Sequence, residues 1–489
     1  MVAAAFLIGG TAAYAAGKPT HGRQPEPSAR AMRPVTGAYT WRPDLDPQVA
    51  WSNYSENVIY DTYIPLLTYR HAGGKAGSEV IPGLARSLPR ITDHGRTYTL
   101  RLRKGLRYSD GEPVRASDFR FAVERMFRIG SGGGFYGPEH FYDDIVGARR
   151  FEKTRRGDIP GVIIDARTGR IVIHLVRPER SFSRKLAMTW AAPVPPGTPI
   201  HNQSFDPPPA TGPYVITDST RRGWTYERNP EWRSHDHKLM PRIPSGHLDT
   251  IKIKVVRDEA KAIKEVERGR LDWVSEEMPG PDYLSLRHRF PSRLRLEPTL
   301  GTEYFWLNTS KPPFDDVRVR RAVNYAVDRT VFSRLTGGQL SPTQQILPPD
   351  LPGYRKSSLY PHDMARARQL IAAADPSVRD ITLWTYAERG DLTPVEFNVY
   401  LAAVLEELGF TVHLKVLRPE RYFALIEGPG QADPDAGLSG YSANYPDPDD
   451  FLRETVGSRV TSYYNQNLSQ FFVPSLRQVI DRLEARPGR

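Results

Sequence analysis

The sequence predicts an α/β protein with at least two lobes. Its 489 residues exceed the roughly 250 to 300 residues that one hydrophobic core organises. Strand-like alternation at residues 97–102 and 171–176 occurs beside helical spacing of apolar residues at 117–127 and 315–332. With 39% hydrophobic and 25% charged residues, the composition is that of a folded protein, so wholesale disorder and a fibrous repeat are excluded.

Residues 1–16 are predicted to be an export signal. They are apolar and small, and Ala13-Tyr14-Ala15 has the small-x-small pattern of a cleavage site. No Lys or Arg precedes Lys18, which indicates a start inside a longer signal or anchor, and a buried N-terminal helix is the less favoured alternative. Residues 17–40 are rich in Pro, Gly, Arg and Ala without periodicity, which predicts a flexible spacer and folding from Trp41 onward.

Strands and helices continue to alternate along the rest of the chain. Ser117-Asp118 and Asp315-Asp316 place carboxylates at expected helix starts, where the helix dipole favours negative charge. A strand at residues 248–256 is followed by a helix at 259–268. Breaks rich in Pro and Gly mark surface connections at residues 193–199, 207–213 and 241–246.

The composition also excludes several partners and chemistries. The chain has no cysteine, so disulfides, thiolate zinc sites, cysteine nucleophiles and a lipid-modified cysteine anchor are all absent. The net charge of +11 comes from Arg residues that are interleaved with Asp and Glu, which indicates a basic solvated surface and no nucleic-acid site. No stretch after the N-terminus approaches the roughly 20 apolar residues that span a bilayer.

No motif indicates an enzyme, a metal or a cofactor. There is no Gly-x-Ser-x-Gly elbow, and the neighbouring acids Glu276-Glu277 are expected to be solvated. His235-Asp236-His237 contains acceptable metal ligands but lacks the spacing of zinc motifs. The glycine run at residues 130–134 has no following Lys-Ser/Thr, so a flexible connection is favoured over a phosphate loop.

Several sequence blocks occur in the order of one known family. They are Leu45-Asp46-Pro47, YTLRLRKG at 98–105 with SDGEPV at 109–114, and residues 60–69, 81–85, 211–214, 227–230, 269–272, 317–322 and 326–329. Over about residues 45–465 the chain resembles the peptide-type solute-binding proteins of bacterial ABC importers, the oligopeptide- and dipeptide-binding proteins of extracellular solute-binding family 5. Because many of these positions are turns, such as Asp110-Gly111, they indicate the fold more than the ligand.

The resemblance implies a two-lobed periplasmic-binding-protein-like α/β fold, with an extra domain inserted in the first lobe. On this basis residues 41–60 and 190–300 form lobe one, residues 61–189 form the inserted domain, and residues 301–489 form lobe two. Family members usually continue with a segment that returns to lobe one. The chain ends at Arg489 after a helix-like stretch at 475–484, so we expect that return segment to be missing.

The resemblance also implies a ligand-binding strand around residues 438–448. Gly440, Tyr441, Ser442 and Asn444 are predicted to bind ligand, because an extended peptide pairs with the main chain of this strand in the family. Peptide-binding relatives have an aspartate at position 444 that pairs with the ligand's α-amine. The Asn444 amide oxygen accepts a hydrogen bond but carries no charge.

Two alternatives stay open for the residues around this strand. Asp447 or Asp449 substitutes for the missing aspartate, or both simply cap the turn before Phe451. Tyr304 and Trp306 alternate onto one face of a predicted strand, where they either line the ligand pocket or belong to the core of lobe two. A core position is favoured for Trp190.

The sequence therefore predicts an extracytoplasmic solute-binding subunit of an ABC importer. It captures a short peptide or a similar small solute by hinge closure and delivers it to a membrane permease. We expect a monomer that is exported and associated with the outer face of the bacterial cell membrane. A surface peptide-sensing protein without transport, and a degenerate family member, are the alternatives, and oligosaccharides, siderophores or metal chelates are alternative solutes.

Overall fold

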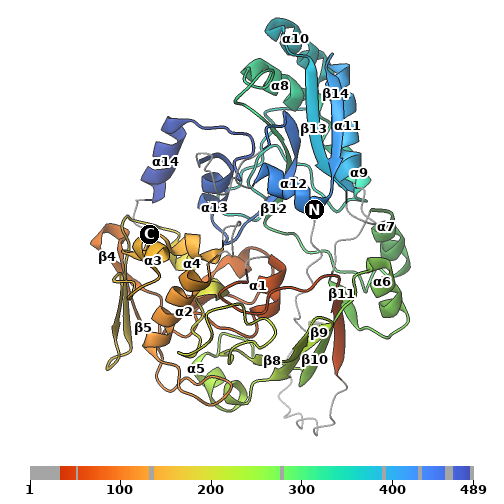
Figure 1. The fold of residues 1–489 in the computed structure, drawn as a ribbon. Coiled ribbons are helices and arrows are strands. Elements are labelled where there is room, and N and C mark those ends of the chain that lie inside the picture. The colour runs from red at the N-terminus through yellow and green to blue at the C-terminus, as the bar shows by residue number, and fades with distance from the viewer. Residues whose placement is uncertain are drawn as a thin grey trace, which may run out of the picture.

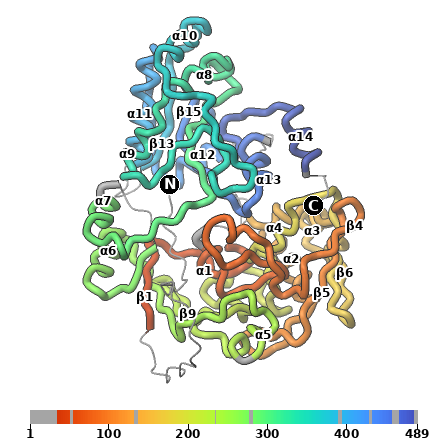
Figure 2. The backbone as a smooth tube through the Cα atoms, turned by 180° about the vertical axis from the view of Figure 1, so that it is seen from behind, coloured from red at the N-terminus to blue at the C-terminus, as the bar shows by residue number. Residues whose placement is uncertain are grey.

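A computed structural model shows two α/β lobes, one above the other in Figure 1 and seen from behind in Figure 2. The structure describes residues 34–50, 53–130, 137–275, 280–387, 393–427, 432–457 and 466–484. The predicted export signal (residues 1–16) and most of the predicted spacer lie outside these residues. In the described part of the chain, no helix is both long and apolar enough to cross a bilayer.

Lobe one is built on a five-stranded sheet. Its strands are ordered β11 (Trp273–Ser275), β1 (Val35–Tyr39), β10 (Thr250–Val255), β9 (Gly223–Arg228) and β8 (Tyr214–Thr220). Its helices are α1 (Asn53–Ile59), α5 (His237–Leu239), α6 (Glu259–Glu267) and α7 (Gly280–Arg289). The predicted strand at 248–256 and helix at 259–268 correspond to β10 and α6.

The prediction of a spacer up to residue 40 is wrong for residues 35–39. These form β1, which runs parallel to both β10 and β11 inside the sheet of lobe one, with Ala38 fully buried. The strand was missed because it is short and contains Gly37. That glycine is required, since a Cβ at this position would lie 2.7 Å from Cδ2 of Trp273 on the neighbouring strand.

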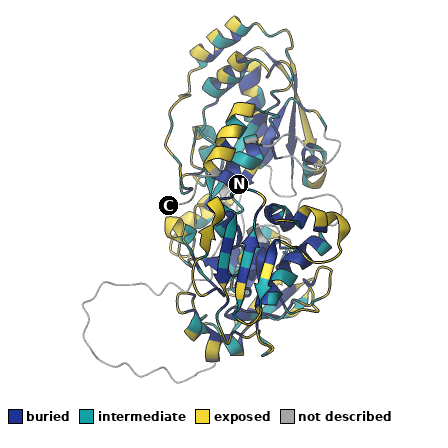
Figure 3. Ribbon diagram, turned by 90° about the vertical axis from the view of Figure 1, so that its left-hand side faces the viewer, coloured by how far each residue is buried: buried dark blue, intermediate teal, exposed yellow. Residues whose placement is uncertain are grey.

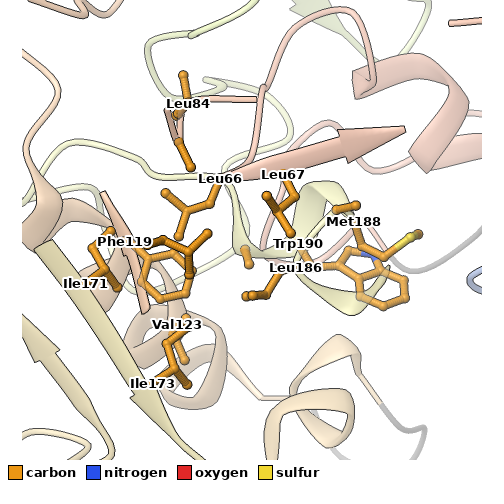
Figure 4. Close-up of a cluster of buried hydrophobic side chains, with 14 of the residues drawn as sticks. Leu66, Leu67, Leu84, Phe119, Val123, Ile171, Ile173, Leu186, Met188 and Trp190 are labelled. Atoms are coloured by element: carbon orange, nitrogen blue, oxygen red, sulfur yellow. The ribbon is translucent and has the colours of Figure 1, made fainter. Parts of the chain in front are cut away.

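The inserted domain has an antiparallel sheet ordered β4 (Arg90–Thr92), β5 (Thr97–Arg101), β7 (Arg170–His174) and β6 (Val162–Asp165). A hairpin of β2 (Leu67–Tyr69) and β3 (Val80–Pro82) and the helices α2 (Ala116–Ile129), α3 (Ala148–Thr154) and α4 (Phe182–Lys185) complete it. Figure 4 shows Phe119 and Val123 of α2 beside Ile171 and Ile173 of β7. The same hydrophobic cluster buries Trp190, as the sequence favoured.

A buried ion pair ties the inserted domain to lobe one. Nη2 of Arg125, on α2, lies 2.6 Å from Oδ2 of Asp46, and both side chains are fully buried. Arg125 also donates to Gln48 Oε1 at 2.7 Å. The Leu45-Asp46-Pro47 block therefore has a structural role. The predicted boundaries at 60/61 and 189/190 stay predictions, since one hydrophobic core extends across the second of them.

Lobe two is built on a mixed sheet ordered β12 (Gly301–Leu307), β15 (Ala436–Ser442), β13 (Asp380–Tyr386) and β14 (Thr411–Leu417). Its helices are α8 (Val317–Ala326), α9 (Thr330–Leu335), α10 (Met364–Ala374), α11 (Thr393–Glu407), α12 (Pro419–Ile426), α13 (Pro448–Leu452) and α14 (Pro474–Glu484). In Figure 3 buried residues follow the strands of both lobes, and the outward sides of the helices are exposed.

The helix predicted at residues 315–332 is two helices. Asp316 caps α8 as predicted, accepting a hydrogen bond from the Arg318 backbone N–H at 2.7 Å. The helix ends at Ala326 because Val327 is extended. Asp328 then accepts from the Thr330 backbone N–H at 2.9 Å, at the residue where the next helix, α9, begins. Apolar periodicity continued across this break and concealed it.

Candidate ligand-binding site

The predicted ligand-binding strand, β15, pairs antiparallel with β12. Glu303 lies opposite Gly440, Tyr304 opposite Ser439, and Trp306 opposite Gly437. Because directly opposite residues share a face and successive residues alternate, this ladder has two distinct faces. The cavity face carries Glu303, Phe305, Leu307, Leu438, Gly440 and Ser442. The aromatic face carries Tyr304, Trp306, Ser439 and Tyr441.

The aromatic face is covered by lobe two itself. Trp306 is 4% exposed and packs with Trp384 and with Tyr422 of α12. Tyr304 is partly buried against the same cluster, and Tyr441 makes an edge contact with Phe451 at a centroid distance of 5.0 Å. For Trp306 the structure favours the core alternative over a pocket wall.

The cavity face is open to solvent at one end only, because Leu438 is buried and Phe305 and Leu307 pack against the core of lobe two. Gly440 and Ser442 are exposed, and Glu303 is half-buried. A cavity of about 410 Å³, which we call the lobe-two cavity, lies along this face between β12 and the loop at residues 339–350. Its wall includes Glu303, Phe305, Leu307, Arg329, Phe332 and Leu438, and also Tyr304, which the sequence predicted as a ligand-binding residue. Its size falls within the range of small-molecule sites.

The main chain of β15 has an open edge next to this face. On the side away from β12, strand β13 pairs only with Ala436 and Gly437, so within the described residues no strand pairs with 438–442 on that side. In β15 the odd-numbered residues form the hydrogen-bonded pairs with β12. The two ends of the ladder show this, since Asn308 N donates to Asp435 O and Ala443 N donates to Leu300 O. The N–H and C=O groups of Gly440 and Ser442 therefore point toward the open edge.

Asn444 is held by hydrogen bonds within the protein. Its backbone N–H donates to Asp450 Oδ2 at 2.7 Å, and its side-chain amide donates to Asp450 Oδ1 at 3.2 Å and to Tyr441 Oη at 2.9 Å. Asp450 is 1% exposed, and burial raises the pKa of its carboxyl well above the usual range. The Asn444 side chain thus serves as a donor to a buried acid.

Asp447 caps α13, which is the structural alternative that the sequence left open. Its Oδ1 accepts from the Asp449 backbone N–H at 3.0 Å. Its Oδ2 lies 2.9 Å from Nη1 of Arg184 in the inserted domain. Asp449 accepts from Ser181 Oγ at 3.0 Å and from Tyr445 Oη at 3.2 Å. Both carboxylates therefore have structural partners.

The stretch after β15 docks onto the inserted domain, and we call residues 445–453 the anchor segment. Tyr445 is 2% exposed and belongs to the core of the inserted domain, where its ring meets Phe141 at 5.8 Å. Nζ of Lys185 lies 5.6 Å from the Tyr445 ring and forms an ion pair with Glu179. The chain thus passes directly from an open strand edge into a buried contact between lobes.

Of the remaining candidates from the sequence, only the cluster at His235 lies within the described residues. His235 Nδ1 lies 2.8 Å from Asp236 Oδ1, and Asp236 Oδ2 accepts from the Arg107 backbone N–H at 3.2 Å. Among the described residues, no three His, Asp or Glu side chains are placed to hold a metal ion together. Glu276, Glu277 and residues 131–134 lie outside the described residues.

Two α/β lobes, an inserted antiparallel domain and an open strand edge beside the contact between lobes are the architecture of a solute-binding protein. The family of bacterial extracellular solute-binding proteins, family 5 Middle, matches residues 79–463, and this chain belongs to that family. The predicted family and fold class are confirmed.

The curated relatives differ in the solutes for which they are named. A probable deoxycholate-binding periplasmic protein of Escherichia coli is 27% identical over 316 residues, which cover 63% of this chain and 56% of the relative. Heme-binding protein A of Haemophilus influenzae is 25% identical over 425 residues, which cover 81% of this chain and 72% of the relative. The match thus spans little more than half the length of the first relative.

Solved structures share the fold over nearly the whole chain. Clavulanic acid biosynthesis oligopeptide binding protein 2 has a TM-score of 0.82 at 25% identity, covering 94% of this chain and 86% of that one. The periplasmic binding protein DppA from Helicobacter pylori, solved with the peptide STSA, has a TM-score of 0.69 at 18% identity, covering 93% and 87%.

Proposed function

We propose that this chain is the extracytoplasmic solute-binding subunit of an ABC importer and that it captures short peptides. The observation that carries the proposal is the open edge of β15, where Gly440 and Ser442 direct main-chain N–H and C=O groups outward. A peptide added to such an edge is bound through its own main chain, so its side-chain sequence matters little. Membership of the solute-binding family and the names of the oligopeptide-binding relatives support the same assignment.

The proposed mechanism is closure of the two lobes over the peptide. A ligand that pairs with β15 and also touches lobe one favours the closed form by its excess affinity for that form. The anchor segment keeps the end of β15 against the inserted domain while the ligand binds. The importer permease would recognise the closed protein at the outer face of the membrane and receive the peptide there.

Native mass spectrometry of the full chain, purified from its own host without refolding, tests the proposal. Denaturing the protein would release the carried solute, and we expect a series of short peptides. A sterol-like or porphyrin-like solute would contradict the peptide assignment and would instead fit the apolar wall of the lobe-two cavity, including Phe305, Phe332 and Leu438.

A chemically altered peptide tests the main-chain pairing itself. Methylating one peptide nitrogen of tri-alanine removes a donor to the strand edge, so we expect its affinity, measured by calorimetry, to fall by about tenfold. Equal affinity of methylated and unmodified tri-alanine would show that the peptide does not add to β15.

A further inference from the structure

Glu303 has an unusual position in the ladder between β12 and β15. It lies opposite Gly440, and its carboxylate extends over that glycine. A Cβ built at Gly440 would lie 2.7 Å from Cδ and 2.8 Å from Oε2 of Glu303. Only glycine leaves room for the carboxylate to lie over β15 without moving it.

This carboxylate is beside the proposed binding edge. The main-chain groups of Gly440 point to that edge, and Glu303 also forms part of the wall of the lobe-two cavity. An extended ligand that pairs with Gly440 would therefore lie within reach of a negative charge. A carboxylate and an ammonium form a charge-assisted hydrogen bond that is about twice as strong as a neutral one.

Asn444 is poorly placed for this role. It carries no charge, and its amide N–H groups are already directed at Asp450 and Tyr441. Asp447 and Asp449 are held by the cap of α13 and by contacts with the inserted domain. Glu303 lies on the cavity face of the ladder, directly opposite Gly440.

We infer that Glu303 binds a primary ammonium group of the ligand, the free α-amine of a short peptide, and that Gly440 provides the space for this contact. The inference rests on the proposed function, because it assumes a peptide at the edge of β15. The inference assigns amine recognition to Glu303 on β12, and not to residue 444, which follows β15.

Calorimetry with three probes tests this inference: tri-alanine, N-acetyl-tri-alanine, and an N-acetylated tripeptide that contains one lysine. The unaltered full-length protein should bind tri-alanine about tenfold more tightly than its acetylated form. Glu303→Gln should remove that preference, since it keeps the shape and loses the charge. The exposed Glu297 gives a matched control, and Glu297→Gln should retain the preference.

The outcomes separate the two proposals. If Glu303→Gln keeps the full preference for tri-alanine, the role of Glu303 is wrong while peptide capture stands. If the acetylated lysine peptide binds as tightly as tri-alanine, the carboxylate reads a side-chain amine and the α-amine assignment is overturned. If the unaltered protein binds none of the three probes, peptide capture itself fails, and this is seen before any substitution is made.

Gly440→Ala tests the geometry without removing the charge. The added Cβ displaces the Glu303 carboxylate, so the preference for tri-alanine should fall about tenfold here too. Combining it with Glu303→Gln should cause no further loss, because both changes remove the same contact. Additive losses would overturn the coupling of the two residues. Melting curves that match the unaltered protein establish that each variant folds.

Discussion

Two consecutive stretches of one chain segment differ sharply in their surroundings. Residues 438–442 of β15 have a partner strand on one side only, and Gly440 and Ser442 are exposed. Three residues later, Tyr445 is inside the core of the inserted domain, and Asp449 and Asp450 are buried among hydrogen-bond partners. The first stretch can receive a ligand, and the second fixes its position.

This difference shows how an unpaired strand edge is kept in place. An open edge gives up hydrogen bonds and invites unwanted pairing, so its stability must come from its neighbours. Here the neighbours are β12 on one side and the anchor segment at the C-terminal end. Changes in the anchor segment or in the buried residues that contact it should therefore affect stability most, and changes along the open edge should affect binding most.

The largest effect on stability is expected from Lys185→Met. Burial lowers the pKa of this lysine, but the negative charges of Glu179 and Asp449 raise it more, so the amine stays charged. Methionine keeps the apolar stem but removes the cation from the ion pair with Glu179, while Asp449 keeps its ion pair with Arg453. We expect a loss of about 3 to 5 kcal/mol in the free energy of unfolding, measured with urea at pH 7.

A surface ion pair provides the control for this prediction. Nη2 of Arg368 lies 2.5 Å from Oε1 of Glu407, and both side chains are at least half exposed. Arg368→Met should cost less than about 1 kcal/mol, because solvent screens an exposed pair. Adding Glu179→Gln to Lys185→Met should recover part of the loss. Equal effects of the two single substitutions would contradict the view that the anchor segment is held by a buried network.

A smaller, pH-dependent effect is expected behind the aromatic face, at Glu427. This residue is 8% exposed at the end of α12, and burial raises the pKa of its carboxyl to about 7, against a smaller lowering by the hydrogen bond with Gln466. The pKa of the Glu427 carboxyl in the folded protein exceeds its unfolded value of 4.5. The protonated carboxyl therefore stabilises the fold fully below pH 4.5, and this stabilisation is lost as the pH rises through 7.

Glu427→Gln should remove this loss, because the amide resembles the protonated acid at every pH. We expect the variant to be about 2 kcal/mol more stable than the unaltered protein at pH 8 and nearly equal to it at pH 4.5. Urea unfolding at the two pH values measures the difference. A gain that is the same at both would show that Glu427 does not titrate in this range.

The fold was predictable because its evidence is local in sequence. Turn blocks such as Asp110-Gly111 and the apolar periodicity of α2 and β10 identify the elements and their order. The resemblance then supplies the topology. Strand β1 escaped because a strand of five residues with a glycine has too little pattern, and its place in the sheet depends on partners more than 200 residues away.

The site was only partly predictable, for a related reason. Alternation places Tyr304 and Trp306 on one face of a strand, but which face meets the core depends on helix α12, which packs there much later in the chain. The pairing of Glu303 with Gly440 depends on the register between two strands that are far apart in sequence. The contact between Tyr445 and Phe141 is equally non-local, so no sequence pattern announced the anchor segment.

The smallest effect on stability is expected at the junction of the two stretches, from Asn444→Asp. The substitution removes the amide donor to Asp450 and puts a second carboxylate beside a buried one. Burial and the repulsion between the two negative charges raise the pKa values of both carboxyls in the folded protein above the unfolded value of 3.8. The stability that is present below pH 3.8 is therefore lost as the pH rises. We expect a loss of about 1 kcal/mol at pH 8 and less at pH 4.5.

The family resemblance implies a different result for the same variant, namely stronger binding of a ligand with a free amine. Thermal melting at pH 4.5 and pH 8, together with calorimetry on tri-alanine and its acetylated form, separates the two views. If Asn444→Asp leaves melting unchanged at both pH values and strengthens binding of tri-alanine alone, residue 444 faces the ligand. In that case its hydrogen bonds to Asp450 do not persist when a peptide binds, and Glu303 shares the amine with it.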